Sequence, residues 1–190
     1  MADTPIEIQD IKRILAELAI QLKATSTELD ERFKATDAQF KETDKRIKAA
    51  FDLFEGQWGK LIESLVEGDL LNFLQARGIQ VQDTSTRRKG NYQGTSYEFD
   101  IIAHNGDEIV LVEVKTTLRV SHVKKFIKRL EQAKTWLSEY KNFKIYGAIA
   151  YLKAYEKSDA FAEAKKLFVI RATGDSASII NAVDFRPRVF

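Results

Sequence analysis

Two short apolar segments, residues 97–102 and 109–115, constrain the fold of this chain most strongly. Both have the composition of β-strands, and the Asn-Gly pair between them readily takes the positive φ angles of a hairpin turn. Folding back at that pair should bring Asp100 close to Glu113. Because side chains along a strand alternate between its faces, Glu113 and Lys115 should share one face. We therefore expect two carboxylates and one ammonium to converge, as at a metal site for a phosphodiester.

The composition restricts which metals and nucleophiles are available. The chain has 190 residues, no cysteine and two histidines, His104 and His122. Disulfides, thiolate ligands and cysteine nucleophiles are therefore excluded, and a histidine-rich zinc site is not expected. One histidine falls in the predicted hairpin turn and the other at a helix start, so neither is expected to act as a general base. Any metal should be bound by oxygen ligands.

Charge and hydropathy indicate where the protein works and on what. No apolar run is long enough to span a bilayer, and the N-terminus lacks the basic and apolar regions of a secretory signal, so we expect a cytoplasmic protein with no membrane role. Residues 1–57 are net acidic, and residues 58–190 are net basic. A basic surface around a small acidic centre suits an anionic polymer bound through divalent cations. A solvated, slightly basic surface would have the same composition.

The first part of the chain has the pattern of a coiled coil. From Ile6 to Phe54 there is no glycine or proline, and core-compatible residues recur at alternating steps of three and four, with one stutter. This stripe contains Leu15, Leu18, Leu22, Thr25, Leu29, Phe33, Thr36, Phe40, Thr43, Ile47, Ala50 and Phe54. Such a helix is too long to bury its stripe against a domain of about 130 residues. We therefore predict that residues 1–57 form a homo-oligomeric coiled coil. A helix that folds back on itself or packs on the domain is the alternative.

Residues 58–190 are expected to form one α/β domain. Gly56 and Gly59 mark the expected joint, and Gly78 should end a second amphipathic helix over residues 58–76. The further expected elements are a strand from 79, a basic loop or hairpin tip at 87–91, the two central strands, a helix at 121–140, a strand at 144–152, a helix at 158–166, a strand at 167–171, and a turn at Gly174-Asp175 leading into residues 178–180. This order predicts an α+β mixed sheet with helices on both faces.

Twelve residues separate Asp100 from Glu113-Val114-Lys115 on the next predicted strand, with a Glu-bearing helix before them and a basic helix after them. This arrangement resembles the PD-(D/E)XK nuclease superfamily, and within it the uncharacterised prokaryotic members that carry an N-terminal coiled coil. The matching stretches are residues 58–66, 99–101, 113–115 and 184–187. Phe99 stands where the superfamily name has proline, a departure that many relatives share. The resemblance covers residues 58–190.

The resemblance implies a nuclease-like core preceded by the long coiled-coil helix, and it assigns roles to residues. Asp100 and Glu113, with the Val114 carbonyl as in the family, would bind Mg²⁺, for which Mn²⁺ should substitute. Lys115 would position the attacking water and stabilise the developing charge.

The resemblance also calls for a carboxylate on the preceding helix. It selects Glu63, whereas the spacing of Glu67 to Gly78 suits other branches of the superfamily. For either glutamate, a solvated carboxylate paired with a lysine is the simpler interpretation. Further candidates for contacts to nucleic acid are Arg87, Arg88, Lys89, Lys124, Lys125, Lys128 and Gln132. Arg129 lies beside the lysines of the 121–140 helix, and for all of them an ordinary charged outer face is the alternative.

These features predict a metal-dependent endonuclease that hydrolyses phosphodiester bonds of DNA and is oligomerised by its coiled coil. One alternative is a non-catalytic module that keeps the nuclease fold and binds nucleic acid or a protein partner. Another is a protein whose purpose is the coiled coil, with the domain as a cap. The choice between DNA and RNA, the form and sequence of the substrate, and the oligomer number depend on loops and assembly and are left open.

Overall fold

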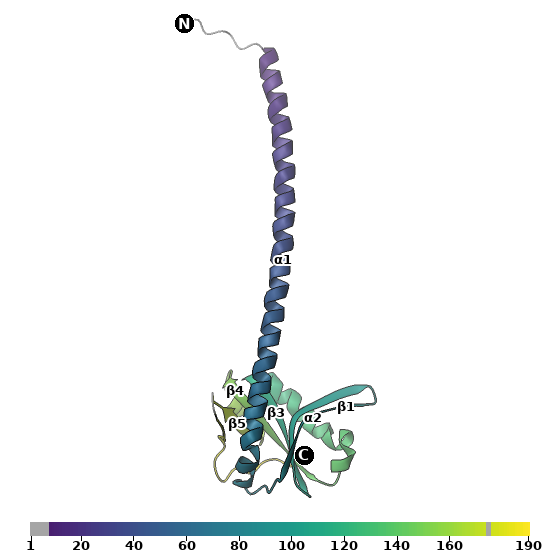
Figure 1. Ribbon diagram of the computed structural model, residues 1–190, viewed down its shortest axis with the longest axis vertical. Helices are drawn as coiled ribbons and strands as arrows, with labels where there is room; N and C mark the ends of the chain where they lie inside the picture. The colour runs from purple at the N-terminus through teal and green to yellow at the C-terminus, as the bar shows by residue number, and fades with distance from the viewer. Residues whose placement is uncertain (1–7, 174–175) are drawn as a thin grey trace. The chain divides into compact units, whose positions relative to one another are not determined.

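The computed structural model describes residues 8–173 and 176–190 (Figure 1). The chain divides into two compact units, Met1–Leu53 and Phe54–Phe190. Helix α1 (Ile8–Gln75) contributes residues to both, and the second unit also holds a six-stranded sheet. The predicted helix start at Ile6 and the predicted turn at Gly174-Asp175 lie outside the described residues.

Helix α1 shows where the prediction of two helices was wrong. It continues through Gly56 and Gly59 without a break. A glycine inside a helix costs only about 1 kcal/mol relative to alanine, and strong helix formers follow. The helix does end near the predicted stop, because Gly78 adopts a φ of +82° and the Ile79 amide donates to the carbonyl oxygen of Leu74.

The sheet is mixed, as the sequence predicted. Its strands follow one another in the order of the chain: β1 (Asp83–Tyr92), β2 (Thr95–His104), β3 (Glu108–Leu118), β4 (Lys144–Ala154), β5 (Phe168–Ala172) and β6 (Ala177–Ile179). The pairs β3–β4 and β4–β5 are parallel, and the other pairs are antiparallel. The α+β class of the domain is therefore confirmed.

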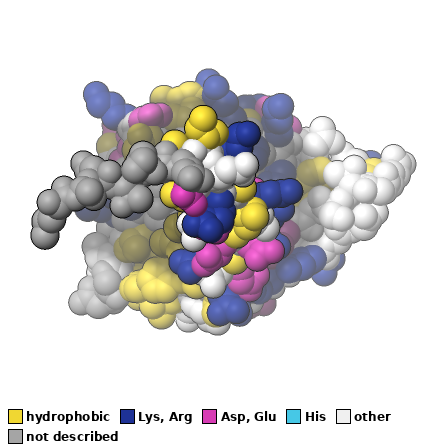
Figure 2. Space-filling model, turned by 90° about the horizontal axis from the view of Figure 1, so that it is seen from above, with side chains coloured by type: hydrophobic (Ala, Val, Ile, Leu, Met, Phe, Trp, Pro, Cys, Tyr) yellow, Lys and Arg dark blue, Asp and Glu magenta, His cyan; other side chains and the backbone are white. Residues whose placement is uncertain are grey.

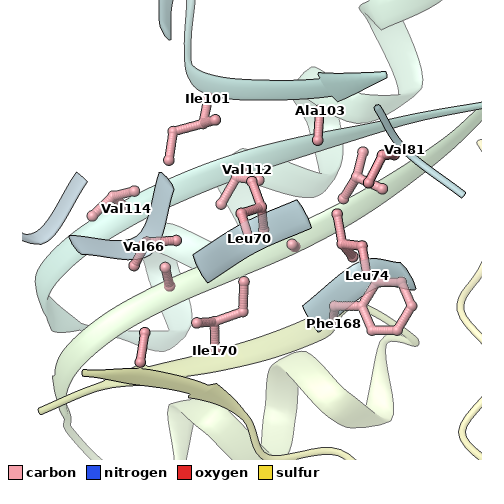
Figure 3. Packing of buried hydrophobic residues seen from close by; sticks show 14 of the residues in the cluster. Val66, Leu70, Leu74, Val81, Ile101, Ala103, Val112, Val114, Phe168 and Ile170 are labelled. Carbon is pink, nitrogen blue, oxygen red and sulfur yellow. The ribbon is translucent and has the colours of Figure 1, made fainter. Parts of the chain in front are cut away.

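Helices cover both faces of this sheet. The two parallel connections carry α2 (Val120–Trp136), followed by the short helix η1 (Ser138–Tyr140), and α3 (Ser158–Ala164). Both crossovers advance in one direction along the sheet, and right-handed connections then place α2 and α3 on the same face. The opposite face packs against the last turns of α1, where Val66, Leu70 and Leu74 are fully buried (Figure 3).

The first strand differs from the prediction. Residues 79–82 are not part of it, and the basic segment expected as a loop or tip lies inside β1. The true hairpin tip is Gln93-Gly94, where both residues have positive φ, +48° and +84°. Most of β1 is exposed and polar, so no hydrophobic alternation marked it. Its pairing with β2 relies on backbone hydrogen bonds, which any residue except proline can donate.

The second hairpin joins β2 to β3 where the sequence predicted it. The turn conformation is different, because Asn105 and Gly106 are not among the residues with positive φ in the described part of the chain. The side-chain oxygen of Asn105 instead accepts hydrogen bonds from the amides of Asp107 and Glu108, both at 2.8 Å. An Asx turn thus closes the hairpin.

In the first unit, the predicted stripe lies on the surface of a single helix. Its leucines and phenylalanines are exposed, for example Leu22 at 65% and Phe33 at 70%. The hydroxyls of Thr25 and Thr43 donate to carbonyl oxygens of the preceding turn. Within the described residues, no helix has the length and apolar character needed to cross a membrane.

Candidate functional site

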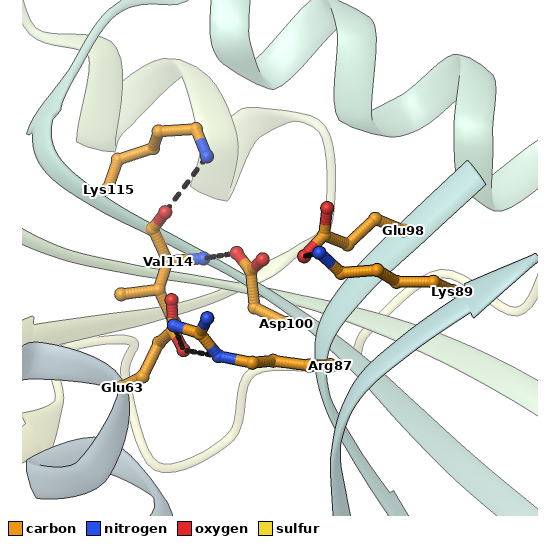
Figure 4. Close-up of polar contacts among 7 residues, drawn as sticks. All are labelled: Glu63, Arg87, Lys89, Glu98, Asp100, Val114 and Lys115. Atoms are coloured by element: carbon orange, nitrogen blue, oxygen red, sulfur yellow. Dashed lines mark hydrogen bonds and ion pairs between the residues drawn. The ribbon is translucent and has the colours of Figure 1, made fainter. Parts of the chain in front are cut away.

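The pairing of β2 with β3 brings Asp100 beside the Glu113-Val114-Lys115 segment. Ile101 lies opposite Val112, so Asp100 comes next to the end of the paired region. The amide of Val114 donates a 2.7 Å hydrogen bond to Oδ2 of Asp100 (Figure 4). The approach of Asp100 to this strand was predicted from the hairpin, and the structure shows it as a direct contact.

The regular alternation of β2 breaks at Asp100. Phe99 packs into the core under α2, whereas Ile101 packs into the core under α1, although two residues of a regular strand would face the same side. The β1–β2 ladder skips the position where Asp100 and Arg87 lie opposite each other. Arg87 has a φ of +52°, a region that arginine rarely occupies. Both the acidic and the basic side chain are thereby directed to the α1 side.

An open pocket of about 340 Å³ lies at this point in the second unit. It is lined by Gly56, Gly59, Lys60, Glu63, Arg87, Asp100, Val114, Lys115 and Thr116. A methyl group added at Gly56 or Gly59 would meet no atom within 4 Å, so these glycines border open space. Helix α1 and strands β1, β2 and β3 thus all contribute to one cavity that a solute can enter.

The electrostatic environment of Asp100 favours a bound cation. Burial raises its pKa to about 6, with further contributions from the negative charges of Glu113 and Glu63. The Val114 amide and the Lys115 ammonium act in the opposite direction. A carboxylate that is costly to ionise for these reasons would be stabilised by a positive ion placed against it.

Glu113 is buried at 5% exposure and is held by two cations. Its Oε1 lies 2.7 Å from Nζ of Lys115, and its Oε2 forms an ion pair with Nη2 of Arg129. That second oxygen accepts no hydrogen bond of acceptable geometry. Nζ of Lys115 also donates to the Val114 carbonyl oxygen at 2.9 Å. Glu113 and Lys115 therefore share a face, as the alternation predicted.

The part played by Arg129 was not predicted. Sequence reasoning placed this arginine with the lysines of a charged outer helix face. Its Nη1 donates to the carbonyl oxygen of Glu98 at 2.8 Å, and its guanidinium lies over the ring of Phe126. The available signal was its position on α2, directly before the buried Leu130 and three residues after Phe126.

The two helix carboxylates have different neighbours. Glu63 lines the pocket with Asp100, and its Oε2 accepts hydrogen bonds from Nε and Nη2 of Arg87 at 3.0 and 2.7 Å (Figure 4). Glu67 lies one turn further on, where its Oε1 accepts a hydrogen bond from the Thr84 hydroxyl. Of the two alternatives left open by the sequence, Glu63 is the carboxylate next to Asp100.

Glu113 is not among the lining residues of this pocket, and neither are the remaining predicted residues. Arg88 pairs with Glu139 at 2.8 Å, and Lys89 pairs with Glu98 at 3.2 Å. The other candidates are exposed on α2 and are not among the lining residues: Lys124, Lys125, Lys128 and Gln132. On the face shown in Figure 2, basic and acidic side chains lie interspersed.

The two histidines also lie outside the lining of the pocket. His104 is 3.7 Å from a carboxylate oxygen of Asp83. The pKa of His122 is lowered by burial and by the nearby Lys115 ammonium, and its Nδ1 is buried without a hydrogen bond.

The donor groups fit an oxygen-preferring divalent ion in kind. Asp100, Glu113 and the Val114 carbonyl supply two carboxylates and one neutral oxygen, the type of set that Mg²⁺ uses while keeping water on its other positions. Within residues 8–173 and 176–190, however, no group of three or more His, Cys, Asp or Glu side chains is arranged to hold a metal. Glu63 and Glu113 are instead paired with cationic side chains of the protein.

These features define an α+β domain with a mixed sheet and a pocket, between α1 and strands β1 to β3, that is lined by both carboxylates and cations. The chain belongs to the family described as Domain of unknown function (DUF8196), whose model matches residues 72–179. The matched region includes Asp100, Glu113 and Lys115 but not Glu63. A search of curated proteins returned no match.

Several solved structures resemble part of the chain. A protein of unknown function, AF1548, is 15% identical with a TM-score of 0.38, over 54% of this chain and 54% of that one. A repair endonuclease from Pyrococcus abyssi is 16% identical with a TM-score of 0.37, over 55% and 44%. An EndoMS–dsDNA2 complex is 14% identical with a TM-score of 0.36, over 56% and 43%. The chain thus spans about half the length of these structures, and likeness of this strength assigns no activity to it.

Proposed function

We propose that residues 54–190 form a divalent-metal-dependent endonuclease domain of the PD-(D/E)XK type, acting on phosphodiester bonds of DNA. The observation that carries the proposal is the contact between Asp100 and the Glu113-Val114-Lys115 strand. There, a carboxylate with a pKa raised to about 6 accepts the amide hydrogen bond of the residue between a glutamate and a lysine. RNA offers the same phosphodiester chemistry and is the alternative substrate.

Asp100, Glu113 and the Val114 carbonyl would hold Mg²⁺ or Mn²⁺. When bound, the ion would supply an activated water and neutralise charge on the phosphoryl oxygens. The two carboxylates come from adjacent strands joined by hydrogen bonds, so their separation is set by the sheet. At neutral pH, Asp100 is largely ionised and ready to act as a ligand, because its pKa of about 6 lies below 7.

Lys115 would act on the developing charge. Its ammonium is held by the carboxylate of Glu113 at 2.7 Å and by the Val114 carbonyl at 2.9 Å. Both contacts lie at the proposed ligands, so the positive charge is placed where a phosphoryl oxygen or an attacking water would be bound. A preorganised ammonium of this kind stabilises a transition state without reorganisation. We assign Glu63 as the helix carboxylate because it lines the same pocket.

The test is a cleavage assay with the full-length protein in Mg²⁺ or Mn²⁺, using duplex and single-stranded DNA and RNA in parallel. Glu113→Ala and Lys115→Ala should each abolish cleavage, whereas Glu139→Ala, outside the pocket, should cleave like the wild type. Cleavage that survives both the Glu113 and the Lys115 substitution would show that another site is responsible.

A second candidate function rests on the ion pairs of the site. Glu113 is paired with both Lys115 and Arg129, an arrangement that neutralises its charge with no metal present. A non-catalytic module that binds nucleic acid or a protein partner would have no need of a metal. Thermal unfolding distinguishes the two functions, because a ligand that binds only the folded state raises the melting temperature. Stabilisation by Mn²⁺ supports the nuclease, and its absence supports the binding module.

We further propose that the helix of the first unit associates with other copies of itself. Its stripe of leucines and phenylalanines is exposed along the single chain, and the Thr25 and Thr43 hydroxyls are bonded to their own helix. These threonines therefore present methyl groups to a partner. Two or more pockets would then belong to one assembly and could engage one substrate.

Substitutions in the full-length chain test this assembly. Replacing Leu18 and Leu22 together by glutamate should reduce the mass measured by sedimentation to that of the monomer. Lys23→Glu, which lies off the stripe, should leave the assembly intact. An unchanged mass for the double variant would refute the coiled coil.

A further inference from the structure

Arg87 is the cation of the pocket that the strand holds in an unusual backbone conformation. Its φ of +52° is in a region that residues other than glycine or asparagine occupy only at an energetic cost. It lies opposite Asp100, at the one position that the β1–β2 ladder skips between its paired neighbours. The strained residue and the skipped ladder position both lie opposite Asp100. This backbone conformation therefore directs the Arg87 guanidinium into the pocket.

The contact that Arg87 makes there is weak enough to exchange. Nε and Nη2 both bond to the same oxygen of Glu63, at 3.0 and 2.7 Å. The Arg87 side chain is 41% exposed, whereas that of Glu63 is 17% exposed. Ion pairs with one partner this open to water contribute little net stability. The arginine can therefore leave at small cost, and Glu63 would remain in the pocket.

The charges that line the pocket indicate where Arg87 would go. Lys60, Arg87 and Lys115 face two carboxylates, Glu63 and Asp100. Adding a divalent cation gives the pocket a clear positive excess, and a phosphate group offsets such an excess. A guanidinium matches phosphate oxygens with two parallel hydrogen bonds. Arg87 lines the pocket from an exposed part of β1, so its guanidinium is accessible to a phosphate group from solvent.

We propose that Arg87 is an exchangeable cation of this pocket. It neutralises Glu63 while no divalent ion is bound, and it is released by the ion to bind a backbone phosphate of the substrate. This inference rests on the proposed function, since it requires a metal at the Asp100 carboxylate. It adds a substrate-binding role for Arg87. It also gives Glu63 a second partner, the divalent ion, which replaces Arg87.

Arg88 provides a matched control. It is the next residue of β1, carries the same charge, and also forms an ion pair, with Glu139 at 2.8 Å. It does not line the pocket around Asp100. Arg88→Gln therefore removes the same charge from the same strand without freeing Glu63.

The first measurement is Mn²⁺ binding to the full-length protein by calorimetry, without nucleic acid. Arg87→Gln should tighten Mn²⁺ binding roughly two- to fivefold, the factor expected when an exposed ion pair no longer competes. Arg88→Gln should leave the affinity unchanged. In a Glu63→Gln background, Arg87→Gln should no longer tighten binding, because the competition requires Glu63. Equal tightening in both backgrounds would show that the loss of the Arg87 charge acts on Mn²⁺ binding without Glu63. This result would refute the proposed exchange.

The second measurement is nucleic-acid binding in Ca²⁺, an ion chosen to suppress cleavage. Arg87→Gln should weaken DNA binding and lower the slope of log affinity against log salt by about one unit, as expected for one lost phosphate contact. Without divalent ions, the same substitution should have little effect on DNA binding. A loss of affinity that is equal with and without Ca²⁺ would refute release by the metal.

The outcomes separate this inference from the proposed function. If Arg87→Gln tightens Mn²⁺ binding but no nucleic acid is cleaved, the exchange stands and the endonuclease activity fails. If the wild type cleaves DNA and Arg87→Gln binds Mn²⁺ no more tightly, only the exchange is overturned. If no variant binds Mn²⁺, both proposals fall.

Discussion

Replacing Asp100 by asparagine should stabilise the metal-free protein at neutral pH. The substitution removes the charge that burial and the neighbouring carboxylates of Glu113 and Glu63 make unfavourable. The asparagine side-chain oxygen can still accept the hydrogen bond from the Val114 amide, so the local geometry is retained. A residue that lowers the stability of the folded protein is expected at a site where its side chain serves binding and does not serve folding.

The magnitude follows from the pKa. In the folded protein it is about 6, against 3.8 for the unconstrained group. A difference of about two pKa units corresponds to about 3 kcal/mol. Because the folded state holds this proton more tightly than the unfolded state, the contribution to stability is fully present below about pH 4. It is lost as the pH rises through 6. Above about pH 7, the full difference in the free energy of unfolding between the wild type and Asp100→Asn should be visible.

Urea unfolding at pH 5, 6, 7 and 8 in the presence of a chelator measures this difference. Tryptophan fluorescence is a suitable probe, because Trp58 and Trp136 both lie in the second unit. The protein concentration must be the same for every variant, since self-association would make stability depend on it. Asp107→Asn, in the exposed turn between β2 and β3, is the control and should change stability little at any pH.

The gain in stability for Asp100→Asn should grow from pH 5 to pH 8 and then level off. A variant that is less stable than the wild type at pH 8 would refute the electrostatic account of the site. A gain that does not vary with pH would refute it equally, because the ionisation of Asp100 would not be its source. Saturating Mn²⁺ should reverse the order of stability, since the wild type alone keeps the charged ligand.

Two further substitutions test the packing that supports the site. Arg129→Leu leaves Glu113 buried with one fewer cation and should lower the free energy of unfolding in urea by about 3 kcal/mol. Replacing both residues by leucine should recover much of that loss. A double variant that is no more stable than the single variant would contradict this account. Gly147→Ala places a methyl carbon 2.5 Å from Leu130 and 2.8 Å from Leu167, so overpacking should lower the free energy of unfolding by about 1–3 kcal/mol. A change in this free energy within experimental error would show that α2 shifts freely.

The parts of the fold predicted from sequence are those with strong local signals. The apolar runs of β3 and β4 and the stripe of α2 gave the order of the core elements. Strand alternation placed Glu113 and Lys115 on one face. Gly78 ended α1 because a positive φ there is accessible to glycine at little cost. Each of these features depends on residues that are close in the chain.

The incorrect predictions concern features whose local signals were weak or ambiguous. A second helix was expected to begin after Gly56, but α1 continues through Gly56 and Gly59 because two glycines cost less than the surrounding helix formers contribute. Residues 87–91 were interpreted as a loop or hairpin tip because they form a basic stretch, although the backbone groups of β1 pair with β2 regardless of side chain. The Gln93-Gly94 turn was missed for the same reason, since no apolar strand marked its approach.

The sequence by itself determined which chemical groups this protein can use: oxygen ligands without thiols, one glutamate and one lysine two residues apart on a strand, and a hairpin that brings Asp100 to them. Only the tertiary structure decided how those groups are neutralised. Arg87 lies 24 residues from Glu63 in the chain, and Arg129 lies 16 residues from Glu113. No local sequence pattern encodes such a contact. The reason is physical: charges interact according to distance in space, which the packing of α1, α2 and the sheet sets.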